Sequence, residues 1–189
     1  MAEQSLVERT RRWVIEKYPY NSGHLVRTLE WVDRLAPGSS EAVRLAALTH
    51  DMERAFPGPD QPITRLNDVE YYRAHSDRSA RIVSEWLRQN GASPGLADEV
   101  SALIRLHEFG GNPNATLVQA ADSLSFLETN IDLFLDFARS KKYAVDEIRV
   151  KFQETLDRIE LPLARALAAP LAADALRRLD QQEHSQSLG

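Results

Sequence analysis

The segment Ser40-Glu41-Ala42-Val43-Arg44-Leu45-Ala46-Ala47-Leu48-Thr49-His50-Asp51 has the pattern that most clearly sets the fold of this chain. Ser39 or Ser40, followed by Glu41, is a typical helix start, because a serine side chain can accept a bond from a free backbone amide. Most positions that follow are apolar, so we expect this helix to pack in the core. It leads directly into His50-Asp51, which places two chemically active side chains at the end of a buried helix.

Helical patterns of the same kind cover the rest of the chain and are separated by proline and glycine. We expect Pro94-Gly95 to end one helix, and Asn114 or Thr116 to cap another. The predicted helices lie at about 3–18, 22–36, 67–90, 96–108, 117–127, 130–142, 145–160 and 161–180, with Pro162 and Pro170 as boundaries or kinks. Residues 57–62 are the longest irregular segment, and no segment alternates as a strand does. We therefore predict an all-α, single-domain helical bundle.

The composition narrows the functional classes. The chain has 189 residues, with 43% hydrophobic and 27% charged residues, which is typical of a globular protein. Its formal net charge of −5 argues against a general nucleic-acid binder. It contains no cysteine, which excludes disulfides, thiolate metal sites and a cysteine nucleophile. It has no apolar signal segment or stretch of membrane-spanning length, so we expect a cytoplasmic location and no membrane partner.

Four of the five histidines fall on separate predicted helices, next to apolar positions, whereas His184 lies in the polar tail. The four are His24, His50, His75 and His107. A lone histidine in such a place is most simply a core or surface residue with a satisfied ring. Several inward-facing imidazoles need partners, however, and a shared metal ion satisfies them together. Asp122, flanked by alanines and Leu124, is either a buried hydrogen-bond acceptor or a further metal ligand.

The order of these residues resembles the HD superfamily of metal-dependent phosphohydrolases, in which a histidine, an adjacent His-Asp pair and a later aspartate lie on one helical bundle. The matching residues are His24, His50-Asp51 and Asp122. His75 and His107 match two further histidines of a six-ligand type, similar to the bacterial HD hydrolases that cut diadenosine tetraphosphate symmetrically. The resemblance covers residues 20–130 as a metal-binding core, with a helical extension at 131–180 and a frayed tail at 181–189.

The resemblance also implies a ligand set and a reaction. One divalent cation would take His24, His50, Asp51 and Asp122, and Asp51 would bridge to a second cation at His75 and His107. A ligand set without sulfur suits Fe or Mn, which we favour, and also Zn, Co or Mg. Water activated by one or two such cations would hydrolyse a small phosphorylated substrate, such as a nucleotide or another phosphate ester or anhydride.

Several neighbouring residues are candidates for supporting roles. Arg54 and Arg78 each follow a ligand by three residues, so we expect both to bind substrate phosphate, although each could also be a surface arginine. Glu53 could orient a ligand or form a salt bridge. Glu108 follows His107 directly, and neighbouring residues of a helix point about 100° apart, so we do not assign it to the site.

Two other functions remain open at this stage. Some HD proteins with six ligands hold a di-iron centre that uses oxygen to cleave organophosphonates or oxidise polyols, and Tyr18 or Tyr20 would be compatible with such a site. A non-catalytic signalling domain is the other alternative, although such domains have usually lost ligands. Phe56 and the loop at 57–62 are candidates for a lid, and the apolar residues of 161–179 offer a face for a homodimer.

Overall fold

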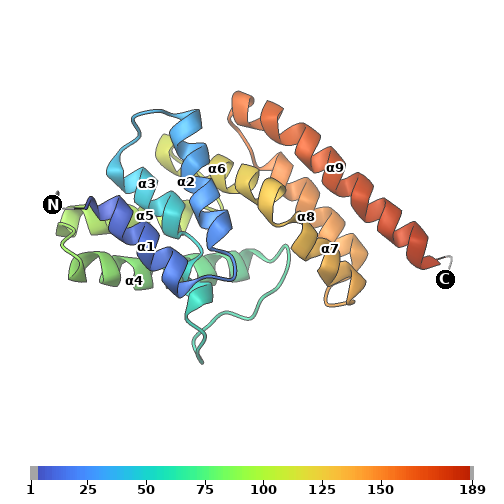
Figure 1. Cartoon of the computed structure of the whole chain (residues 1–189), viewed down its shortest axis with the longest axis horizontal. Helices are drawn as coiled ribbons and strands as arrows, with labels where there is room; N and C mark the ends of the chain where they lie inside the picture. Colours follow the sequence, from blue (N-terminus) through green and yellow to red (C-terminus); the bar gives the residue numbers. More distant parts are fainter. Residues whose placement is uncertain (1–3, 188–189) are drawn as a thin grey trace.

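The computed structural model describes residues 4–187, and within this range it contains helices and no strand (Figure 1). The elements in chain order are α1 (Leu6–Lys17), α2 (Ser22–Leu35), α3 (Glu41–Thr49), the short 3₁₀ helix η1 (Met52–Ala55), α4 (Val69–Gln89), α5 (Pro94–Leu106), α6 (Pro113–Thr129), α7 (Ile131–Arg139), α8 (Val145–Asp157) and α9 (Pro162–Ser187). The predicted all-α bundle is confirmed. No described helix is both long enough and apolar enough to cross a membrane.

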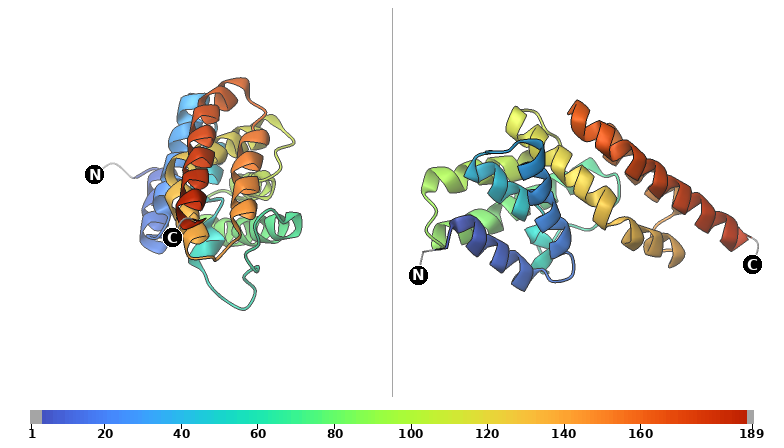
Figure 2. Two further views of the ribbon diagram at one scale, coloured as in Figure 1. Left: turned by 90° about the vertical axis from the view of Figure 1, so that its right-hand side faces the viewer. Right: turned by 45° about the horizontal axis from the view of Figure 1, so that its top comes forward.

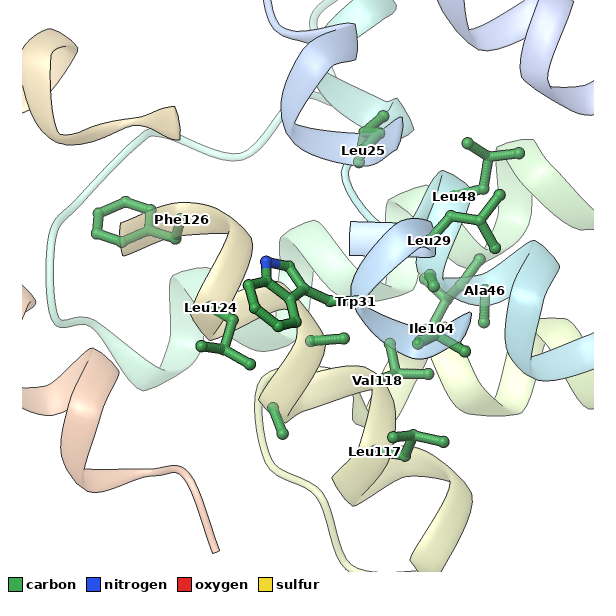
Figure 3. Close-up of a cluster of buried hydrophobic side chains, with 14 of the residues drawn as sticks. Leu25, Leu29, Trp31, Ala46, Leu48, Ile104, Leu117, Val118, Leu124 and Phe126 are labelled. Carbon is green, nitrogen blue, oxygen red and sulfur yellow. The ribbon is translucent and has the colours of Figure 1, made fainter. Parts of the chain in front are cut away.

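Helices α1 to α6 form the first half of the bundle. Helix α2 packs on α3 and α6, α3 packs on α5, and α4 packs on α5 and η1. Figure 3 shows buried side chains from α2, α3, α5 and α6 meeting in one cluster, among them Leu25, Leu48 and Ile104. Their burial removes apolar surface from water, which is the main force that holds these helices together.

Helix α6 connects the two halves of the bundle. Every residue from Ala115 to Leu127 is buried, so this helix has no solvent-facing side over most of its length. It contacts α2, α3 and α5 in the first half and α7, α8 and α9 in the second. A polar residue in the middle of α6 is therefore enclosed by protein from both halves.

Helix α9 lies along α6, α7 and α8 and carries the chain past the end of the bundle (Figures 1 and 2). Its buried positions are mainly alanines spaced three or four residues apart, at Ala164, Ala168, Ala172 and Ala175, so one narrow face approaches its neighbours closely. Pro170 lies inside this helix and does not end it. The tail that we expected to fray from residue 181 continues as helix to Ser187.

The structure also corrects two predicted helix starts. Pro94 begins α5 as its first residue, with Ser93 as the cap, and does not end the preceding helix. Helix α6 begins at Pro113, and its cap is Asn112 rather than Asn114 or Thr116. In both cases proline occupies the first helical turn, where its missing amide hydrogen costs nothing.

Replacing the α6 cap should weaken the fold measurably. The Asn112 side chain accepts a hydrogen bond from the Ala115 amide at 3.0 Å. We expect Asn112→Ala to lower the free energy of unfolding by about 1 kcal/mol. Asn114→Ala, at an exposed position one residue into α6, should change it by less than about 0.5 kcal/mol. Urea unfolding of both variants tests the assignment, and a larger loss for Asn114→Ala would contradict it.

Candidate metal centre

The six predicted ligands lie together in the structure, although they come from five separate segments. His24 is in the first turn of α2, His75 in α4 and Asp122 in α6, whereas His50-Asp51 and His107 directly follow α3 and α5. All six side chains are buried. The packing of α2 to α6 thus brings together residues that are up to about 100 positions apart in the sequence.

The ligand atoms of these residues converge on two carboxylates. The Nε2 atoms of His24 and His50 lie 3.1 and 3.3 Å from the same oxygen of Asp122, Oδ1. His75 Nε2 lies 3.5 Å from Asp51 Oδ1. In each of the groups His24–His50–Asp122 and His50–Asp51–His107, one ligand atom per residue lies within 4.8 Å of the others, so each group could hold a metal ion.

Backbone carbonyls fix the direction of two of the imidazoles. His50 Nδ1 lies 2.9 Å from the Ala47 carbonyl oxygen, and His107 Nδ1 lies 2.7 Å from that of Ile104. Because a carbonyl oxygen only accepts hydrogen bonds, each Nδ1 must donate. In the neutral ring the lone pair then resides on Nε2, the nitrogen that faces the carboxylates.

Ser125 fixes the ring of His24 in the same way. Its hydroxyl donates to the His24 carbonyl at 2.7 Å and lies 3.0 Å from His24 Nδ1. Since the hydroxyl hydrogen is used by the carbonyl, the serine oxygen accepts from Nδ1–H. His24 Nε2 therefore also carries a free lone pair, and three imidazoles present the same nitrogen to one space.

Several of these nitrogens lack hydrogen-bond partners although they are buried. Among the described side chains, His50 Nε2, His107 Nε2 and both ring nitrogens of His75 have no contact with hydrogen-bond geometry. A buried polar atom without a partner costs about 1–3 kcal/mol, so a cluster of four calls for an explanation. A donor set of imidazole nitrogens and carboxylate oxygens fits a divalent metal ion.

The charges around the centre affect the two helix-end histidines in opposite ways. Burial lowers the pKa of His50, but Asp122 and Asp51 outweigh it and raise that pKa to about 9. Burial also lowers the pKa of His107, to about 4, so this ring is neutral at physiological pH. The carboxylates beside His50 thus attract positive charge, whereas His107 offers a lone pair.

Glu108 belongs to this cluster, contrary to our expectation. One carboxylate oxygen lies 3.5 Å from His75 Nε2 and 3.7 Å from His107 Nε2, and the side chain is only 7% exposed. The expected divergence of neighbouring residues applies within a helix, but α5 ends at Leu106. Glu108 therefore follows the helix as Asp51 follows α3, and a second His-acid pair faces the same centre.

Arg158 is a residue of the centre that sequence analysis did not identify. It extends from the end of α8, and its guanidinium donates to Glu108 and, at 2.6 Å, to Asp122 Oδ2. Its Nε also donates to the Ser123 hydroxyl at 2.8 Å. This cation contributes to holding the pKa of both carboxyls well below their usual range, against the effect of burial. The helical extension thus supplies a counter-ion to the predicted core.

Arg78 has a different role from the one predicted. Its guanidinium donates to the backbone oxygens of Glu53 and Phe56 and to the carboxylates of Glu53 and Asp60. The side chain is buried, and these four acceptors bond its two terminal nitrogens, Nη1 and Nη2. Arg78 therefore holds η1 and the following loop in place, and it does not line the cavity described below. The Glu53 carboxylate, in turn, lies 3.5 Å from His75 Nδ1.

A cavity of about 290 Å³ opens beside the centre. Asp51, Asp122 and Arg54 line it, and the Arg54 Nε lies 3.0 Å from Asp51 Oδ2. Arg54 thus reaches the position expected of it, next to a predicted ligand and facing the cavity.

Aromatic side chains and the irregular loop form further parts of the cavity wall. Tyr18 and Tyr20 line it, as do residues 61 and 64–66. Phe56 instead packs against Trp13, with ring centroids 6.2 Å apart. The later part of the loop, rather than Phe56, therefore borders the cavity.

The account of Arg158 predicts a large loss of stability when its charge is removed. Arg158→Met leaves Glu108 and Asp122 buried without their cation, which should lower the free energy of unfolding by about 3 kcal/mol. Arg139→Met is the matched control, because Arg139 pairs with Asp136 at the surface and should lose no more than about 0.5 kcal/mol. Denaturant unfolding without added metal compares the two. Equal losses would contradict the role given to Arg158.

Comparison with known proteins adds a family but no function. No curated protein and no solved structure matches the sequence. A family model described as "Domain of unknown function (DUF4202)" matches residues 7–177, from α1 into α9. This span includes all six predicted ligands as well as Glu108 and Arg158. Because the match covers well over half of the sequence, the chain belongs to the DUF4202 family.

Proposed function

We propose that this protein is a metal-dependent phosphohydrolase of the HD type, acting on a small phosphorylated substrate. One observation carries the proposal: imidazoles from four segments direct Nε2 atoms toward the carboxylates of Asp51, Glu108 and Asp122 in a buried space. Hydrogen bonds on Nδ1 explain the orientation of three of these rings. Such bonds are typical of histidines that bind metal ions.

Two positions for a cation follow from the grouping of the ligands. The first would use His24, His50 and Asp122, and the second would use His75, His107 and Glu108. Asp51 lies between them, since it groups with His50 and His107 and also faces His75. The donors are nitrogen and oxygen only, which supports iron or manganese as the metal, with zinc, cobalt and magnesium as alternatives.

The charge balance favours an anionic substrate. Four buried carboxylates and three arginines form ion pairs at and around the centre. The carboxylates belong to Asp51, Glu53, Glu108 and Asp122, and the arginines are Arg54, Arg78 and Arg158. The net formal charge of these seven side chains is −1, so two divalent cations would raise the net charge of the centre to about +3. When bound, such cations supply Lewis acidity and lower the pKa of water. A phosphate group would be attracted to this end of the cavity.

Side chains of the chain itself would position that phosphate. Arg54 faces the cavity with about a third of its side chain exposed, while its Nε is held by Asp51. Lys151 and Arg158 line the cavity on the α8 side. Three cationic side chains thus surround the buried carboxylates, and the cavity between these side chains stays open. The volume of about 290 Å³ suits a small molecule rather than a polymer.

Metal content and phosphate release test the proposal together. Protein purified without chelators should contain at least about one equivalent of iron or manganese, and should release phosphate from a panel of nucleotides and small phosphate esters. Asp51→Asn should lower kcat/KM by about 100-fold or more. His184→Gln is the matched control, because His184 is exposed on α9 and bonds its own helix.

Two outcomes would overturn this function. Phosphate release that does not change with metal content, or in Asp51→Asn, would exclude the centre as the site of hydrolysis. Product formation from organophosphonates that requires oxygen would instead identify an oxygenase. The assay is therefore run in air and under nitrogen, and the proposal requires equal rates in both.

Removing the Ser125 hydroxyl should weaken metal binding without changing any ligand. Ser125→Ala deprives His24 Nδ1–H of its acceptor, and the loss of such a partner typically costs 10- to 100-fold in affinity, about the loss we expect. Competition with a chelating dye measures the affinity. Ser84→Ala is the matched control, since Ser84 bonds the Arg81 carbonyl of its own helix. An unchanged affinity in Ser125→Ala would contradict the orientation argument.

A further inference from the structure

The cavity beside the centre is lined by five cationic residues, and one of them differs from the rest. They are Arg54, Arg65, Lys142, Lys151 and Arg158. Arg54, Arg65 and Arg158 each pair with a carboxylate, and Lys151 donates to the Tyr72 hydroxyl at 3.3 Å. Among the described residues, the Lys142 ammonium has no hydrogen-bond or ion-pair partner.

Aromatic rings hold Lys142 at the edge of the cavity. Its Nζ lies 4.1 Å from the ring centroid of Phe137 and 5.6 Å from that of Tyr143. These cation–π contacts restrict the side chain but leave the ammonium hydrogens free for another acceptor. Lys142 is exposed and lies on the turn between α7 and α8, whereas the ligands lie on α2 to α6 or directly after these helices. Its charge is therefore at the solvent side of the cavity.

The wall beside Lys142 is apolar. Phe126, Leu133, Phe134, Phe137 and Tyr143 line the cavity on the side formed by α6, α7 and the following turn. Phe134 packs edge-on against Phe126 and Phe137, with centroids 5.0 and 5.4 Å away. The four aromatic residues of this set are linked by ring contacts and form one aromatic surface. Such a surface would bind a flat apolar group.

We infer that the substrate is a phosphate ester with a ring-bearing apolar body that carries a second anionic group, and that Lys142 binds this second group. The inference rests on the proposed function, because that function places the phosphate at the carboxylate and histidine end of the cavity. The aromatic wall then contacts the apolar body of the substrate, and Lys142 contacts the second anionic group at the solvent side of the cavity. Lys142 is thus a specificity-determining residue rather than part of the reaction.

A pair of phosphonates that cannot be hydrolysed tests this inference by binding alone. The probes are benzylphosphonate and its para-carboxy derivative, titrated calorimetrically into manganese-loaded protein. The derivative should bind about 10-fold more tightly, because its carboxylate gains a charge-assisted hydrogen bond. Lys142→Met should remove this preference and leave the affinity for benzylphosphonate within about 2-fold of the original.

Two further variants separate Lys142 from its surroundings. Lys141→Met removes the same charge from the neighbouring residue, which does not line the cavity, and should keep the preference. Lys151→Met should weaken both probes alike, because Lys151 lines the cavity on the α8 side, where the proposed function places the phosphate.

These titrations distinguish a failure of the role given to Lys142 from a failure of the proposed function. Equal binding of the two probes to the unmodified protein, or a preference that survives Lys142→Met, would overturn the role of Lys142 and leave the proposed function intact. Binding of neither probe would overturn both. A preference that disappears only in Lys142→Met and is kept in Lys141→Met would establish the inference.

Discussion

The hydrogen bond from an imidazole Nδ1–H to a carbonyl at the end of its own helix is the interaction on which the candidate centre depends. The last carbonyls of a helix have no further helical turn to bond, and α3 and α5 each use a carbonyl of their last turn to hold the imidazole of the histidine that follows. The bond selects the tautomer, so Nε2 faces inward with its lone pair. The same turn places an acid, Asp51 or Glu108, directly after each histidine. Two helix ends thus provide two similar halves of one site.

Helix α6 connects the candidate centre to the rest of the protein. Because it is buried from Ala115 to Leu127, Asp122 lies where the two halves of the bundle meet, and its carboxylate contacts groups from both. His24 and His50 approach from the first half, and Arg158 approaches from the second. The carboxylate is therefore shared between candidate metal ligands and a permanent cation. The ion pair that joins the two halves of the bundle and the first candidate metal site therefore share this one side chain.

The sequence was sufficient to place most of the helices and to show that four histidines are buried, because both depend on local signals. Proline and glycine mark most helix boundaries, and histidines beside apolar stripes must face inward. Arg158 could not be found in this way, since its position depends on how α8 packs beside α6 and nothing in its local sequence differs from a surface arginine. Arg78 was assigned from spacing alone, which does not show that backbone carbonyls occupy its guanidinium. Glu108 had a detectable signal: His107-Glu108 ends its helix as His50-Asp51 does.

Anomalous X-ray diffraction from crystals grown with manganese tests the central claim most directly, because it locates the metal without reference to activity. A metal centre at these residues predicts an anomalous peak about 2.1 Å from the Nε2 atoms of His24 and His50 and from an oxygen of Asp122. A second peak would lie among His75, His107 and Glu108, beside Asp51. Peaks confined to the protein surface, with these imidazoles bonded only to protein or water, would contradict the account.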